Sequence, residues 1–231
     1  MNDDPMIQRS RLLNADLVDW NNRMFHKHPT PYRGVAGFIE WSRVRAVLKF
    51  AGVKPDDTVL EIGCEAGHLL IHCPPAKRIV GGDISSTALR CACRQFEAEA
   101  RSAEFFHLDA QEALPFSPGE FSVIICSEVL EHVNRPGDVL GNIHRLAGPD
   151  TRIIISIPTE RPKILVKKAL RVLGLFRLLF PGIEKEHSEW HLQVFSKKKL
   201  LGLSDSLFRV RKSRWIWLNH YVALMNRKDC R

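Results

Sequence analysis

The chain has 231 residues, of which 45% are hydrophobic and 26% are charged, and its formal net charge is +8 at pH 7. These are the values of an ordinary globular domain, and they exclude long disordered and collagen-like chains. No stretch reaches the roughly 18 uninterrupted apolar residues of a membrane-spanning helix, and the acidic N-terminus is not a secretory signal. The six cysteines form no Cys-x-x-Cys pair, so we expect reduced thiols in a cytoplasmic protein without structural zinc.

The charge is unevenly distributed along the chain. Residues 1–150 contain 16 basic and 20 acidic residues, whereas residues 151–231 contain 18 basic and six acidic residues. This asymmetry indicates that the C-terminal third meets an anionic partner, either a membrane surface or a nucleic acid. The alternative is that these basic residues only face solvent.

In chain order, residues 1–35 are expected to form a helical or irregular lead-in that caps the domain. An amphipathic helix is predicted over residues 37–50, with Gly52 and Pro55 after it. Strand and helix patterns then alternate, with strands at residues 58–62, 78–82, 104–108, 121–126 and 152–157 and helices at 85–100 and 137–147. This alternation predicts an α/β fold, a doubly wound and mostly parallel Rossmann-like sheet with helices on both faces.

The character of the chain changes after Pro158. Residues 161–183 carry six basic residues, no acidic residue and a broad apolar face, which is typical of an amphipathic helix at a membrane interface. We expect an inserted lid over residues 161–190 that docks on the inner face of a membrane, or else an ordinary cap over the active site. A helix at 196–204 and a hairpin of strands near 207–213 and 215–225 close the sheet.

Polar residues follow the strands at their carboxyl ends. Residues 59–67 read VLEIGCEAG, a buried strand that ends in a glycine loop and leads into a helix at 68–71. Gly63 lets the backbone turn sharply and approach a ligand closely. Asp83 follows 20 residues later at the next strand tip, a spacing suited to a ribose diol. With Asp109 and Ser127 at the following tips, the pattern indicates a nucleoside cofactor.

This series of motifs resembles the class I S-adenosylmethionine-dependent methyltransferases. The matching segments are VLEIGCEAG, VGGDIS (80–85), HLDAQEALPF (107–116), FSVIICSEVLEHV (121–133) and RIIISIPTE (152–160). They keep the order and spacing of the family from about residue 37 to the C-terminus. The resemblance implies one methyltransferase domain over residues 36–231 with a seven-stranded sheet whose last strand is antiparallel.

The resemblance also implies which residues contact the cofactor. They are Glu61, Gly63, Cys64, Gly67, Asp83, Ile84, Asp109, Ala110 and Ser127. Asp83 would accept from both ribose hydroxyls, Asp109 from the adenine amino group, and Glu61 from the methionine amino group. Ala110 would offer its backbone N–H to the adenine ring, and Ser127 would touch the methionine end.

One position departs from the family pattern. The usual central glycine of the first loop is Glu65 here, which implies a changed loop or a changed cofactor affinity. The same residue disfavours the competing reading as an NAD site, because a pyrophosphate needs a glycine at that point.

The segment SEVLEHV brings Glu128, Glu131 and His132 just past the fourth strand. In a helical turn, their side chains would share one face and, with His191, would hold a divalent Mg, Mn or Zn ion. This pattern resembles the ubiquinone-biosynthesis O-methyltransferases and the small-RNA terminal 2′-O-methyltransferases. In the metal-free alternative, His132 is a general base beside Glu128 and Glu131, or a structural residue.

The carboxylate–histidine cluster favours an oxygen acceptor, because a hydroxyl must lose its proton when it is methylated. The expected function is therefore O-methylation of a small hydrophobic or lipid-like molecule with S-adenosylmethionine. One alternative is RNA 2′-O-methylation, with the basic residues 197–199 and 209–214 binding phosphates and Trp215 and Trp217 stacking on bases. The other is a catalytically inactive binding subunit with the methyltransferase fold.

Overall fold

The structure is a computed structural model that describes residues 7–9, 13–27, 34–158, 192–217 and 219–228. The expected lid at 161–190 and the candidate metal ligand His191 lie outside these described residues. Within them, no helix combines the length and the apolar character that crossing a bilayer requires.

The described strands form a single eight-stranded sheet in the order β1-β4-β3-β2-β5-β6-β8-β7. They are β1 (Ile7–Arg9), β2 (Thr58–Ile62), β3 (Arg78–Asp83), β4 (Glu104–His107), β5 (Phe121–Ser127), β6 (Ala147–Pro158), β7 (Phe208–Ile216) and β8 (His220–Arg227). Strands β1 to β6 pair in parallel, and β8 runs antiparallel to both β6 and β7. The expected doubly wound fold with an antiparallel last strand is confirmed. The expected number of seven strands is wrong, because β1 pairs with β4 and adds an eighth strand at the edge of the sheet.

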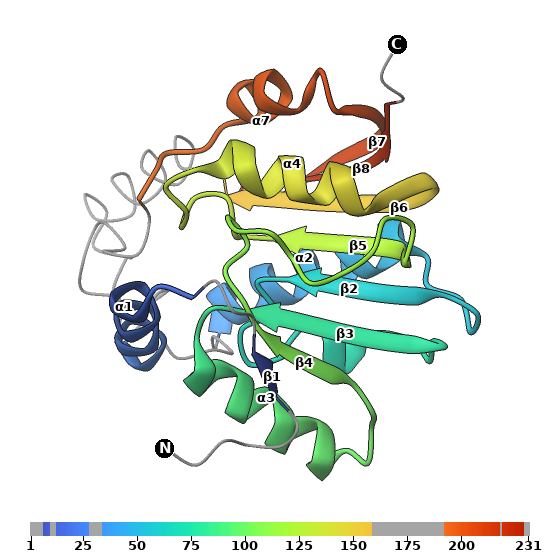
Figure 1. Cartoon of the computed structure of the whole chain (residues 1–231). Coiled ribbons are helices and arrows are strands. Elements are labelled where there is room, and N and C mark those ends of the chain that lie inside the picture. The colour runs from blue at the N-terminus through green and yellow to red at the C-terminus, as the bar shows by residue number, and fades with distance from the viewer. Residues whose placement is uncertain (1–6, 10–12, 28–33, 159–191, 218, 229–231) are drawn as a thin grey trace.

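Helices cover both faces of this sheet (Figure 1). They are α1 (Ala15–Lys27), α2 (Gly34–Ala51), α3 (Ser86–Ala98), α4 (Pro136–Leu146) and α7 (Lys197–Ser204), with one 3₁₀ turn at η1 (Leu70–His72). Helices α2 and α3 contribute to one hydrophobic core, and α4 and α7 contribute to the other. Ile124 and Ile125 of β5 belong to opposite cores, because successive side chains of a strand point to opposite faces. This explains the uninterrupted apolar runs of the central strands.

Helix α1 lies beside the carboxyl ends of the parallel strands (Figure 1). The Asn22 side-chain oxygen accepts from the Ser85 hydroxyl at 2.8 Å and from the Thr87 backbone N–H at 3.1 Å. These bonds satisfy donors at the start of α3, where backbone N–H groups have no partner inside the helix. Helix α1 therefore packs at the edge of the sheet to which Asp83 belongs.

Two local expectations are wrong. Strand β1 falls within the lead-in that was expected to be helical or irregular, because three residues are too few for a periodic signal and its pairing with β4 is a tertiary contact. The helix expected at residues 68–71 is only the short turn η1. Cys73 after it is extended, as a residue before a proline prefers, and this ends the turn.

Gly63 determines how two loops of the sheet edge pack. It ends β2 with a φ of +74°, and a Cβ atom there would lie 2.3 Å from the Val129 Cγ2 atom. Because no real side chain tolerates that approach, a glycine at 63 is required for the loop after β2 to touch the loop after β5.

We expect Gly63→Ala to lower the free energy of unfolding by roughly 2–4 kcal/mol, through overpacking and left-handed strain. The matched control is Gly141→Ala in α4, where an added Cβ meets nothing within 4 Å. That control should raise the free energy of unfolding by about 0.5–1 kcal/mol. Guanidinium denaturation measures both, and equal stability of the Gly63 variant and its parent would contradict the packing argument.

Candidate functional site

Asp83 is held at the carboxyl tip of β3 by the backbone around it. Its two carboxylate oxygens accept from the Ser85 N–H at 2.8 Å and from the Glu65 N–H at 2.9 Å. Burial raises the pKa of Asp83, and the backbone donors work against that shift. Each oxygen can accept more than one hydrogen bond, so the fixed carboxylate keeps acceptor capacity for a diol.

Glu65 preserves the loop although it replaces the usual glycine. Its φ is +48°, the left-handed conformation that a glycine adopts without strain and that costs another residue about 1 kcal/mol. Its N–H still donates to Asp83. Glu65 therefore takes a backbone conformation typical of glycine, and its effect on cofactor affinity stays a prediction.

The other loop residues contribute backbone rather than side chains. The Gly67 N–H donates to the Cys64 carbonyl at 2.8 Å, and Gly67 itself has a φ of +76°. The Cys64 thiol is buried, and burial raises its pKa well above the ordinary value. A Cβ on Gly81 would lie 2.8 Å from this sulfur, so the thiol packs under the loop against β3.

Glu61 is a buried acid beneath this loop. Its side chain is almost inaccessible, and its Oε2 atom has no hydrogen-bond partner within the described part of the chain. Burial raises its pKa to about 8, the charge of Arg43 works against this shift, and the charges of Asp83 and Glu65 add to it. A buried acceptor without a partner is costly, and a cationic ligand group would satisfy it.

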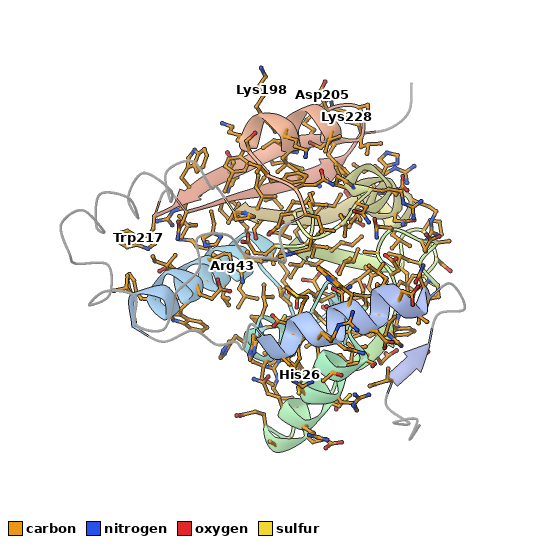
Figure 2. All side chains as sticks on the ribbon, turned by 90° about the vertical axis from the view of Figure 1, so that its left-hand side faces the viewer. His26, Arg43, Lys198, Asp205, Trp217 and Lys228 are labelled. Carbon is orange, nitrogen blue, oxygen red and sulfur yellow. The ribbon has the colours of Figure 1, made fainter. Side chains whose placement is uncertain are left out.

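Arg43 is a site residue that the sequence analysis missed. It lies on α2, it is buried, and its guanidinium donates to the Glu40 carboxylate and to the Ser127 hydroxyl. Burial lowers its pKa, but the carboxylates of Glu40, Glu128 and Glu61 outweigh burial and hold the pKa above its usual range. Figure 2, which looks onto the carboxyl edge of the sheet, shows Arg43 near the middle of that edge.

The tip of β4 supplies the residues expected on the adenine side. Asp109 is buried, and its Oδ1 atom accepts from the Gln111 N–H at 2.9 Å and the Gln111 side-chain amide at 3.2 Å. The Ala110 carbonyl accepts from Asn142 at 2.9 Å. The Ile84 carbonyl lies 2.9 Å from His107 Nε2. These contacts hold the loops after β3 and β4 in place. They leave part of the hydrogen-bonding capacity of the Asp109 carboxylate for a ligand.

Residues 128–132 do not form the helical turn in which the side chains of Glu128, Glu131 and His132 would share one face. Glu128 has a φ of +57°, its N–H bonds to the Ser156 carbonyl at 3.1 Å, and the next helix, α4, begins only at Pro136. The left-handed backbone turns the Glu128 side chain toward β6 and β8. There its two oxygens contact the Ser156 hydroxyl at 2.9 Å and His220 Nδ1 at 3.0 Å.

Glu131 and His132 form a separate pair. Glu131 is buried, and its Oε1 atom lies 3.8 Å from the His132 Nε2 atom. The Glu131 carbonyl accepts from the N–H groups of Leu192 and Gln193 at 2.9 and 3.1 Å. The chain segment that follows residue 191 is therefore attached to this loop.

The predicted metal site has no support in the described residues. Among them, no three histidine, cysteine, aspartate or glutamate side chains gather closely enough to hold an ion. The reason is the geometry of Glu128, which faces His220 instead of Glu131 and His132. With His191 outside the described residues, the complete four-ligand set stays a prediction.

Known proteins resemble this chain in sequence. A family model described as a methyltransferase domain matches residues 36–206. The ubiquinone biosynthesis O-methyltransferase of Thiobacillus denitrificans is 33% identical over 145 residues, which cover 62% of this chain and 60% of that protein. The protein of the same name from Pseudomonas aeruginosa is 30% identical over the same coverage. The chain thus spans about 60% of the length of these curated relatives.

Solved structures agree on the fold. The N-methyltransferase NodS from Bradyrhizobium japonicum, in complex with S-adenosyl-L-homocysteine, has a TM-score of 0.65 at 15% identity and covers 92% of this chain and 99% of that one. A SAM-dependent methyltransferase from Aquifex aeolicus has a TM-score of 0.60 at 15% identity, covering 79% and 88%.

The raised pKa of Glu61 predicts a pH-dependent stability. Between an unfolded pKa of 4.5 and a folded pKa of about 8, the folded protein keeps a proton that the unfolded chain has lost. The free energy of unfolding should therefore fall as pH rises through this range, by up to about 1.4 kcal/mol per pH unit from this group.

Denaturation of the ligand-free protein at several pH values measures this slope. Glu61→Gln should flatten it, whereas Glu99→Gln, a change at an exposed residue after α3, should leave it as in the parent. An unchanged slope in the Glu61 variant would show that Glu61 ionises normally.

Proposed function

Because the chain belongs to the methyltransferase-domain family, we propose that it transfers a methyl group from S-adenosylmethionine to a hydroxyl of a small hydrophobic or lipid-like acceptor. One observation carries the proposal. The Oε2 atom of the buried Glu61 has no hydrogen-bond partner within the described residues. The charge of the buried Arg43 is close enough to lower the pKa of this acid against the effect of burial. An unsatisfied acid beside a buried cation complements the amino and carboxylate groups of an amino acid ligand.

The remaining loop residues fit the rest of this cofactor. Asp83 is fixed with spare acceptor capacity for the ribose hydroxyls. Gly63 and Gly67 give the loop after β2 its left-handed turns and its close packing against Val129 and α3. Asp109 and Ala110 are available to the adenine ring at the tip of β4. When bound, S-adenosylmethionine supplies a methyl group activated by its sulfonium.

An oxygen acceptor is supported by the curated relatives, which are named O-methyltransferases, and by two carboxylate–imidazole pairs near Ser127. The sequence predicts His132 as a base beside Glu128 and Glu131. Of these two acids, Glu131 lies 3.8 Å from His132, whereas Glu128 contacts His220. An imidazole beside a carboxylate accepts the hydroxyl proton as the oxygen attacks the methyl carbon. Holding both reactants in line contributes much of the remaining acceleration.

RNA methylation is the second candidate, and one observation favours it. Strand β7 is exposed along most of its length, and it presents Arg209, Arg211, Lys212 and Arg214 next to the exposed Trp215. Basic side chains with an adjacent aromatic ring are suited to a nucleic acid backbone and its bases. The lipid-like acceptor is preferred because the curated relatives are named for ubiquinone biosynthesis, and docking on a membrane through residues 161–183 belongs to this proposal.

Methyl-labelled S-adenosylmethionine tests the acceptor class. Incubation of the protein with separate lipid and RNA extracts of a cell lysate should place the label in the lipid extract. Label in RNA alone would replace the first candidate with the second. Absence of label from every extract, at a protein concentration that binds the cofactor, would favour a binding subunit without catalysis.

Asp83 tests the cofactor assignment independently of any acceptor. Asp83→Ala should weaken S-adenosylmethionine binding by roughly 10- to 100-fold, because ribose hydroxyls lose a charged acceptor. Calorimetry measures the dissociation constant. Asp56→Ala removes an exposed acid before β2 and should leave affinity unchanged. If both variants bind the cofactor like the parent, the ribose contact is misassigned.

A further inference from the structure

We propose that His220, oriented by Glu128, is the catalytic base that takes the proton of the acceptor hydroxyl. This inference rests on the proposed O-methylation and deepens it, because it assigns the proton acceptor to a residue of the last strand. The sequence analysis placed that role on His132, and His220 was not among its candidates.

The antiparallel direction of β8 brings His220 to the reactive edge of the sheet. His220 is the first residue of β8, and it pairs with Pro158, the last residue of β6. On the other side of β6, Ser156 pairs with Ser127 at the end of β5. The beginning of β8 therefore lies at the same edge as the carboxyl ends of β5 and β6, where ligands bind in open α/β sheets.

A series of hydrogen bonds, each donated in the direction of Glu128, connects Arg43 to that residue. The guanidinium can only donate, so Ser127 accepts from it and is left to donate to Ser156, whose hydroxyl oxygen is 2.7 Å away. Ser156 then donates to Glu128 Oε1 at 2.9 Å. Each hydroxyl proton is thereby assigned, and the buried cation supports the ionised form of Glu128 through this series.

The other Glu128 oxygen sets the tautomer of His220. It lies 3.0 Å from His220 Nδ1, and since an ionised carboxylate only accepts, Nδ1 carries the hydrogen. In a neutral imidazole, Nε2 is then the basic nitrogen. Within the described residues, the hydrogen bond of the His220 ring is the one from Nδ1, and Nε2 is left to accept from a ligand hydroxyl at the edge of the sheet, although His220 is only 6% exposed.

Two features distinguish this pair from His132 with Glu131. The Nδ1–Oε2 distance of 3.0 Å is that of a hydrogen bond, whereas His132 Nε2 and Glu131 Oε1 are 3.8 Å apart. In addition, Glu128 holds a left-handed backbone that costs a non-glycine residue energy. Strain of this kind is concentrated at functional sites, and here it aims the carboxylate at His220.

The proposed step is a single displacement. The acceptor hydroxyl donates to His220 Nε2, and its proton moves there while the oxygen lone pair bonds to the methyl carbon. The carbon–sulfur bond breaks at the same time, and its electron pair stays on sulfur. The products are a methyl ether, neutral S-adenosylhomocysteine and an imidazolium, which returns its proton to solvent. Glu128 stays ionised and stabilises the imidazolium as a positioning residue.

Three histidine variants compare the two candidate bases, with the extract that the parent protein labels as the acceptor. His220→Gln, whose amide can still donate to Glu128, should lower kcat by at least about 100-fold, with the calorimetric affinity for S-adenosylmethionine within about twofold of the parent. His132→Gln should lower kcat by less than about tenfold. His26→Gln, at an exposed residue of α1 (Figure 2), should have the activity of the parent.

A larger loss in the His132 variant than in the His220 variant would overturn the proposal and return the role to His132. Loss of cofactor binding together with activity in His220→Gln would assign His220 a structural role instead. If the parent labels no extract, the proposed function fails first, and this inference fails with it.

Glu128→Gln tests the positioning role through a signal that needs no acceptor. Proton–nitrogen NMR correlations of the histidine rings should show His220 with its hydrogen on Nδ1 in the parent. The variant, whose side-chain amide can also donate, should shift His220 toward the other tautomer. A parent spectrum with the hydrogen on Nε2, or an unchanged tautomer in the variant, would overturn the proposed geometry.

Discussion

The carboxyl edge of the sheet depends on one buried cation. Arg43 reaches from α2 into a region that holds the carboxylates of Glu40, Glu61 and Glu128. Without it, several acids would share a low-dielectric space, where each raises the pKa of the others and favours neutral forms. With it, Glu40 is paired directly, and Glu128 is connected to it through two serine hydroxyls. The charge balance of the whole edge is therefore set by a side chain from outside the sheet.

The same edge of the sheet contains residues with strained backbone conformations. Glu65 and Glu128, the non-glycine residues in left-handed conformations after β2 and β5, both direct hydrogen bonds inside the site. Glu65 turns its N–H to Asp83, and Glu128 turns its carboxylate to Ser156 and His220. The contact of Gly63 with Val129 holds the two loops together. A change that relaxes one loop is thus transmitted to the other by direct packing.

These constraints divide the edge into two parts with different chemistry. The tips of β2, β3 and β4 present fixed acceptors, which suits the binding of a cofactor with many polar groups. The ends of β5 and β6 and the beginning of β8 present hydroxyls, a carboxylate and an imidazole in one hydrogen-bonded series, which suits proton transfer. Ser127 and Arg43, which are joined by a hydrogen bond, lie where the two parts meet.

The sequence by itself predicted the sheet well, because each central strand is buried on both faces and therefore reads as a continuous apolar run. It also predicted that Asp83 and Asp109 lie at the carboxyl edge of the sheet, since one is the last residue of a parallel strand and the other follows the end of one by two positions. It failed where the local signal was weak, as at β1 and the turn η1, and where the backbone left the helical region at Glu128. The sequence did contain a signal for Arg43, because this basic residue stands beside Val44 and Val47 on the apolar side of its helix.

His220 carried no signal of this kind. It is separated from Glu128 by 92 positions in the chain, and the sequence around each residue gives no indication that the two are in contact. Only the antiparallel pairing of β8 with β6 puts them together. Sequence periodicity reports which face of an element is buried, whereas the meeting of distant polar side chains depends on strand order and register, which the tertiary structure alone decides.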